Sequence, residues 1–148
     1  VSIQKKMKKY IFIVLPILMT FLIWGNSLLS VADSNALSFG VAHRIAELVR
    51  ASGINLTLQE LNHIIRKCAH FTEYAVQGAL VTKMLAAKGR SWKYALVIGL
   101  ITAIIDETIQ MFVPGRSGQV TDVLLDWAGC WFGISIVKEI NRKRKHQG

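Results

Sequence analysis

Residues 104–126 read IIDETIQMFVPGRSGQVTDVLLD. The apolar run that leads into them, KYALVIGLITAI at residues 93–104, is typical of a membrane span. A Pro-Gly pair then marks a turn, and a second apolar run follows it. Four carboxylates interrupt this pattern: Asp106, Glu107, Asp122 and Asp126. Because lipid cannot satisfy ionisable groups, the stretch predicts a helical hairpin whose acids face protein or water.

The composition favours a membrane protein of one domain, residues 1–148. Hydrophobic residues make up 52% of the chain, and the mean hydropathy of +0.38 is high for a soluble domain. The net charge of +9 is consistent with basic segments on the cytoplasmic side of a membrane. Nucleic-acid binding is disfavoured, because the basic residues flank apolar runs instead of forming one patch with interleaved aromatics.

Four windows are apolar and long enough to cross the hydrocarbon, since about 20 residues suffice. They cover about 10–29, 67–87, 93–113 and 120–137. The sequence therefore predicts an all-α membrane protein, a bundle of four transmembrane helices. A cleaved signal peptide is the alternative for the first window, but its apolar run is long for that role.

The basic residues predict the orientation of these spans. They gather before the first span, between the second and third, and after the fourth. The positive-inside rule then places both termini in the cytoplasm of a cell-membrane protein. Segment 31–66 and the Pro-Gly turn are expected to face outward.

The outer segment is expected to be helical. Ser34 is predicted to cap an amphipathic helix that ends near Ala51 and lies over the mouth of the bundle or on the membrane surface. Four apolar residues share one face of it: Leu37, Val41, Ile45 and Leu48. Thr57 and Glu60 form a capping-box pattern, which starts a further helix that runs into the second span.

Polar residues of three spans are expected to meet at one depth. One stripe of the second span holds His63, Arg66, His70, Glu73 and Gln77. At about 1.5 Å per residue, the acids of the second, third and fourth spans all lie about 9–12 Å from the outer ends. This convergence predicts an outward-facing polar pocket, with Arg116 over its mouth. The lining is expected to be His63, His70, Glu73, Asp106, Glu107, Gln110, Asp122 and Asp126.

Three motifs resemble those of VanZ-like membrane proteins. RKCAHFTEY at residues 66–74 is similar to the pattern R-K-x-x-H-x-x-E-Y, and DETIQMFVPGR at 106–116 to D-E-x-x-Q-x-F-x-P-G-R. Asp122 with Gly129 and Gly133 resembles the closing D-x-x-x-N-x-x-G-x-x-x-G, although Asp126 stands where the family more often has asparagine. The resemblance runs from about residue 10 to 137. It implies a multi-pass bacterial envelope protein, of a family linked to glycopeptide resistance and to teicoplanin in particular.

The residues leave the chemistry of the pocket open among several functions. An enzyme acting on an envelope lipid or lipid-linked substrate would use His70, Glu73, Asp106 and Glu107 as catalytic groups. Substrate binding would fall to Arg66, Tyr74, Gln110, Arg116, Asp122 and Asp126. A variant holds a divalent cation on Glu73, Asp106, Glu107, Asp122 and His70, but no ligand spacing singles out a metal or another cofactor.

The alternatives need no catalysis. The same pocket would suit a binding or envelope-modulating protein. In a purely structural role, pairs such as His70–Glu73 and Arg66–Asp122 would hold helices together. Ion transport is disfavoured, because the inner halves of the spans offer no continuing polar path.

Overall fold

The computed structural model describes residues 3–51, 53 and 56–146, and all the regular structure in these residues is helical. The five helices are α1 (Ile3–Ser27), α2 (Val31–Ala51), α3 (Leu58–Ala87), α4 (Lys93–Met111) and α5 (Val120–His146). The all-α prediction is confirmed. The helix ends differ from the expected spans: α1 and α4 stop two residues early, whereas α5 continues past residue 137 through the basic tail.

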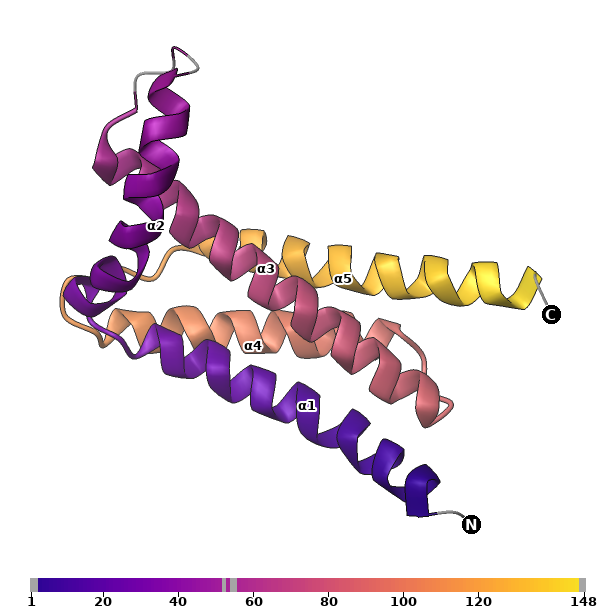
Figure 1. Cartoon of the computed structure of the whole chain (residues 1–148). Helices are drawn as coiled ribbons and strands as arrows, with labels where there is room; N and C mark the ends of the chain where they lie inside the picture. Colours follow the sequence, from indigo (N-terminus) through magenta and orange to yellow (C-terminus); the bar gives the residue numbers. More distant parts are fainter. Residues whose placement is uncertain (1–2, 52, 54–55, 147–148) are drawn as a thin grey trace.

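Helices α1, α3, α4 and α5 form a bundle, and α2 folds back against the first half of α3 (Figure 1). The start of α1, the α3–α4 turn and the end of α5 lie at one end of this bundle, on the right of Figure 1. The α1–α2 and α4–α5 connections lie at the other end. The three basic segments therefore share one end of the molecule, as the charge pattern predicts.

Only three of the described helices are long and apolar enough to cross a membrane, where four were predicted. They contain Tyr10–Ser27, Lys93–Met111 and Val120–Arg144. The predicted second span, 67–87, lies inside α3 and is not among them. The physical reason is the polar stripe of α3, because His70, Glu73 and Gln77 lower its hydropathy.

Helix α2 begins at Val31 and not after Ser34, so the predicted cap is wrong by four residues. The backbone N–H of Asp33 donates to Ser30 Oγ at 3.2 Å, as an N-terminal cap does. The face of α2 that meets α3 consists of small residues, Ala42 and Ala46, which pack on Leu61. Of the predicted apolar face, Ile45 packs against this contact and Val41 is 50% exposed, whereas the side chains of Leu37 and Leu48 lie outside the described part of the structure.

The first turn of α3 carries the predicted capping box. The Thr57 side chain accepts from the Glu60 backbone N–H at 3.2 Å, and Glu60 Oε2 accepts from the Thr57 backbone N–H at 2.9 Å. From this start α3 continues without interruption to Ala87, about 45 Å. One helix, α3, therefore belongs both to the hairpin with α2 and to the bundle.

Replacing Thr57 by alanine should loosen this start of α3, because the Glu60 N–H loses its acceptor. Such caps are worth about 0.5–2 kcal/mol. Amide hydrogen exchange should speed up for residues 58–61 in Thr57→Ala and stay unchanged in Gln59→Ala, an exposed position of the same turn.

Hydrogen bonds from Thr57 lower the pKa of Glu60 below its usual 4.5. The stabilisation of the helix start by Glu60 is thus complete above pH 4.5 and is lost as the pH falls through the lowered pKa.

The closest packing in the bundle joins α3 and α5, which run in the same direction (Figure 1). Gly129 and Gly133 of α5 lie against the backbone carbonyls of Phe71 and Ala75, so near that a Cβ on either glycine would collide with them. Glycine lets helix backbones approach this closely. The two contacts, one turn apart on each helix, fix the register that brings Asp122 and Asp126 beside the middle of α3.

Apolar side chains of four helices form the core of the bundle. Buried residues of α1, α3, α4 and α5 form it, among them Ile23, Tyr74, Ala103, Cys130 and Ile134. Trp24 and Trp127 donate to the backbone carbonyls of Thr102 and Leu96 at 3.3 and 3.0 Å. Each of these two tryptophans therefore links two helices of the bundle.

Candidate functional site

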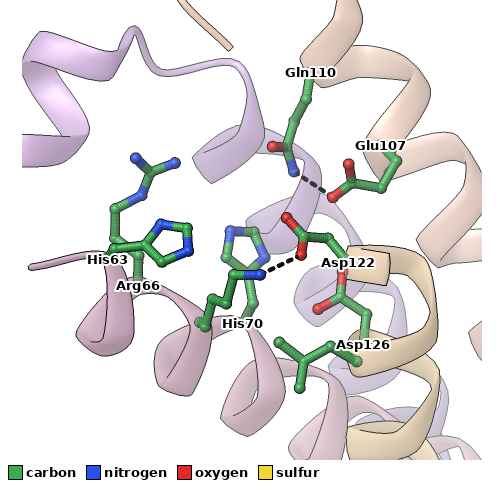
Figure 2. A pocket seen from close by; sticks show the side chains of 9 residues that line it. His63, Arg66, His70, Glu107, Gln110, Asp122 and Asp126 are labelled. Atoms are coloured by element: carbon green, nitrogen blue, oxygen red, sulfur yellow. Dashed lines mark hydrogen bonds and ion pairs between the residues drawn. The ribbon is translucent and has the colours of Figure 1, made fainter. Parts of the chain in front are cut away.

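Three helices enclose a small polar cavity at the end of the bundle near the α4–α5 turn (Figure 2). Its volume is about 40 Å³. The lining comes from α3 (His63, Arg66, Lys67 and His70), α4 (Glu107 and Gln110) and α5 (Asp122, Leu125 and Asp126). A single water occupies about 10–15 Å³ on this measure, so the cavity has room for two or three waters or a hydrated ion.

The deepest part of the site is a cluster of His70, Asp106 and Asp126. One ligand atom of each lies within 4.8 Å of the other two, and His70 Nδ1 is 3.9 Å from Asp106 Oδ2. Asp106 is fully buried and Asp126 is 1% exposed. His70 Nδ1, Asp106 Oδ1 and both oxygens of Asp126 have no hydrogen-bond partner within the described residues. Groups this deeply buried without partners are costly, which is typical of a site that holds something.

Glu107 and Gln110 fix the geometry of the α4–α5 turn. The backbone N–H of Gln119 donates to Glu107 Oε2 at 2.8 Å, and Gln110 Nε2 donates to Glu107 Oε1 at 3.1 Å. Gln110 Nε2 also lies 3.3 Å from Asp106 Oδ2 and 3.4 Å from Ser27 Oγ. Both oxygens of Glu107 are thus engaged. Glu107 therefore links α4 to the residue before α5, and its catalytic role stays a prediction.

Asp122 pairs with Lys67, not with Arg66. Lys67 Nζ donates to Asp122 Oδ1 at 2.7 Å, and both side chains are partly exposed. The proposed Arg66–Asp122 pair is therefore wrong. Neighbouring helical residues point about 100° apart, and of these two cations it is Lys67 that reaches Asp122. The pairing frees Arg66 to line both the cavity and the groove beside it.

A wider groove of about 270 Å³ adjoins the cavity, between α2, α3 and the end of α1. His70 and Arg66 line both spaces. The remaining groove residues are Asn26, Leu29, Ser34, Ser38, Val41, Ile65, Ala69, Glu73 and Arg116. The groove is about as large as the smaller ligand pockets of proteins. Of the three residues of the buried cluster, His70 borders this groove.

Arg116, on the α4–α5 turn, lines this groove and not the cavity, over whose mouth it was expected. Its Nη2 donates to the backbone carbonyl of Asn26 at 3.5 Å, whereas Nε and Nη1 are buried without partners in the described structure. Burial, together with the neighbouring Arg66, lowers the pKa of Arg116. A guanidinium stays charged nonetheless, so Arg116 keeps donors for an anion.

The other predicted residues are placed unevenly. Glu73 accepts from Asn26 Nδ2 at 2.6 Å and lines the groove but not the cavity. No His70–Glu73 bond forms between these two described residues. Tyr74 is fully buried in the apolar core and lines neither space. His63 is exposed and lies at the rim of the cavity.

Sequence reasoning missed two features of the polar interior. Lys67 was treated as the border of a span, yet it closes one wall of the cavity. Gln77 was placed on the polar stripe but not connected to a partner. In the structure its Nε2 donates to Thr20 Oγ1 at 2.9 Å and Thr102 Oγ1 at 3.2 Å, which links α3 to α1 and α4. Neither threonine carries a sequence signal that distinguishes it from an ordinary helix residue.

Comparison with protein-family models matches residues 12–141 to VanZ/LLP1. The chain belongs to the VanZ/LLP1 family. The three motifs that suggested a VanZ-like protein lie inside the matched residues, so that resemblance is confirmed. Family membership and the three apolar helices together fit a membrane protein of VanZ type. Comparisons with curated proteins and with solved structures found no match.

Proposed function

We propose that this VanZ/LLP1 protein spans the bacterial cell membrane four times, with both termini in the cytoplasm. Helix α3 runs along α4 and α5 despite its polar stripe, and the basic segments share one end of the bundle (Figure 1). The stripe faces protein, because His70 and Gln77 contact or line groups of α1, α4 and α5. A helix whose polar side is covered in this way is compatible with lipid on its other side.

The proposed role of the outward end is to bind, and in one variant to act on, the anionic head group of an envelope lipid or lipid-linked molecule. The observation that carries this role is the groove with two guanidinium groups, Arg66 and Arg116, beside the buried His70 cluster. Guanidinium groups bind phosphates and carboxylates through paired N–H donors. The groove opens between helices near the expected lipid interface, where a head group arrives with its tails in the membrane.

Arg116→Gln should weaken this binding by about 10–100-fold, the equivalent of one charged hydrogen-bonded contact. Binding is measured by native mass spectrometry of the whole protein with phosphatidylglycerol, a polyisoprenyl phosphate, or neutral phosphatidylcholine. The matched control is Arg142→Gln, because Arg142 lies on the exposed basic tail beside Glu139. Equal affinity for anionic and neutral lipids, or an equal loss in both variants, contradicts the proposal.

The same samples separate an enzyme from a binding protein. A product that forms with wild-type protein and not with His70→Ala would show catalysis, because His70 is the titratable group shared by the cavity and the groove. Retained binding without product would assign a binding role. In cells, we expect expression of the chain to raise the teicoplanin concentration needed for growth inhibition, and Arg116→Gln to remove that effect at equal protein level.

A further inference from the structure

The geometry assigns a site for one divalent transition-metal ion to His70, Asp106 and Asp126. The three side chains come from α3, α4 and α5, and their ligand atoms lie within 4.8 Å of one another. The inference rests on the same pocket as the proposed function and deepens it. The sequence suggested His70 and Asp106 together with three further acids, Glu73, Glu107 and Asp122. In the structure each of these three further acids accepts a hydrogen bond from another residue. Glu73 accepts from Asn26, Glu107 from Gln119, and Asp122 from Lys67.

The acids of the cluster are placed as ligands in need of a cation. Asp126 is 1% exposed, lines the cavity, and neither of its oxygens has a partner. Asp106 is fully buried, and one of its oxygens is equally unpaired. No hydrogen bond joins these two described carboxyls. Atoms bound to one zinc ion at about 2.1 Å lie about 3.4 Å apart, which small side-chain rotations would reach here.

The charge around the site leaves room for a divalent ion. The cavity, the groove and the cluster together hold five carboxyl groups and three basic side chains. The acids are Glu73, Asp106, Glu107, Asp122 and Asp126, and the bases are Arg66, Lys67 and Arg116. When all are ionised and the histidines are neutral, two negative charges remain uncompensated. A divalent cation would neutralise them in a region where unpaired charge is expensive.

The donor set indicates the class of metal. One imidazole with two carboxylates suits zinc or manganese, whereas magnesium and calcium prefer oxygen ligands alone. Three protein ligands leave at least one coordination position open. The adjoining space of about 40 Å³ can hold waters at that position. His70 also borders the groove, so a ligand there would lie next to the ion.

The test measures metal content and affinity on the whole purified protein. After equilibration with Zn²⁺ or Mn²⁺ and dialysis, wild type should retain about one ion per chain, as measured by inductively coupled plasma mass spectrometry. Groups that only orient a ligand change metal affinity by about 10–100-fold, so Asp126→Asn and Asp106→Asn should lower it by about 100-fold or more. Glu139→Gln is the matched control, because Glu139 is an acid of the same helix that pairs with Arg142 and lines neither the cavity nor the groove; this variant should retain the ion.

A spectroscopic measurement on the wild-type protein tests the site even if the variants do not fold. Co²⁺ added to wild type should give visible absorption that EDTA removes and Zn²⁺ displaces. Folded wild type that retains neither Zn²⁺ nor Mn²⁺, or an Asp126→Asn protein that binds as tightly as wild type, would overturn the site. Failure of the lipid-binding proposal and failure of the metal site give different results. Metal bound without any preference for anionic lipid rejects that proposal alone, and lipid preference unchanged by EDTA with no retained metal rejects the ion alone.

Discussion

Gly133→Leu should abolish the folded bundle. Gly133 lies against the Ala75 carbonyl, so near that any Cβ collides with backbone atoms that cannot rotate away. Helix α5 would have to separate from α3, which opens the most extensive contact in the molecule. We expect a cost at or above the upper range for overpacking, about 3 kcal/mol. Size-exclusion chromatography in detergent should show little or no monodisperse protein.

A glycine in open space provides the control for Gly133. Gly25 in α1 has no atom within 4 Å of an added Cβ, so Gly25→Leu should give wild-type elution and melting temperature. Gly133→Ala should lie between the two, with reduced yield. If Gly133→Leu folds as wild type does, the close approach of α3 and α5 is wrong. The alignment of Asp126 with His70 would then lose its basis.

Cysteine labelling should place Ser117 outside the cell and Lys88 inside. Four crossings put the α4–α5 turn outward and the α3–α4 turn in the cytoplasm. In a Cys68→Ser background, with Cys130 buried, an impermeant maleimide on intact cells should label Ser117→Cys and leave Lys88→Cys unmodified. Disrupting the membrane should expose Lys88→Cys. Both positions are exposed in the folded protein, so burial does not protect them.

The opposite pattern would mean either four crossings with both termini outside or only three crossings. If α3 lay outside the membrane, only α1, α4 and α5 would cross. Lys88→Cys would then react from outside and Ser117→Cys from inside. That result would contradict the proposal of four spans with both termini in the cytoplasm and turn the site toward the cytoplasm. The family membership and the helical fold would stand unchanged.

Local signals in the sequence predicted the helices well. The Thr57–Glu60 capping box marked the start of α3, because the pattern needs only residues three apart. The motif acids of α4 and α5 were expected at matching depth, and the structure gathers Asp106 and Asp126 in one cluster. Depth follows from helix rise alone, so it was predictable without knowing how the helices pack.

Side-chain partners were harder to predict, because they depend on helix rotation and on competing groups. Arg66 and Lys67 are adjacent cations, and only the contact between α3 and α5 decides that Lys67 reaches Asp122. Tyr74 belongs to a family motif but points into the core, one of several directions that motif spacing leaves open. The cap of α2 was misassigned because Ser30 and Ser34 both precede helical sequence. The observed bond to Asp33 N–H selects Ser30.

The close packing of α5 on α3 also bears on the order in which the site is made. His70 and Asp106 lie on helices synthesised before Asp126, which sits near the start of α5. As the chain emerges from the ribosome, Asp106 leaves it 20 residues ahead of its companion from α5. The cluster is complete only after the glycines of α5 have docked against Phe71 and Ala75. A chain that ended before α5 would therefore hold two of the three residues of the cluster, and the docking of the last helix is the step that completes the site.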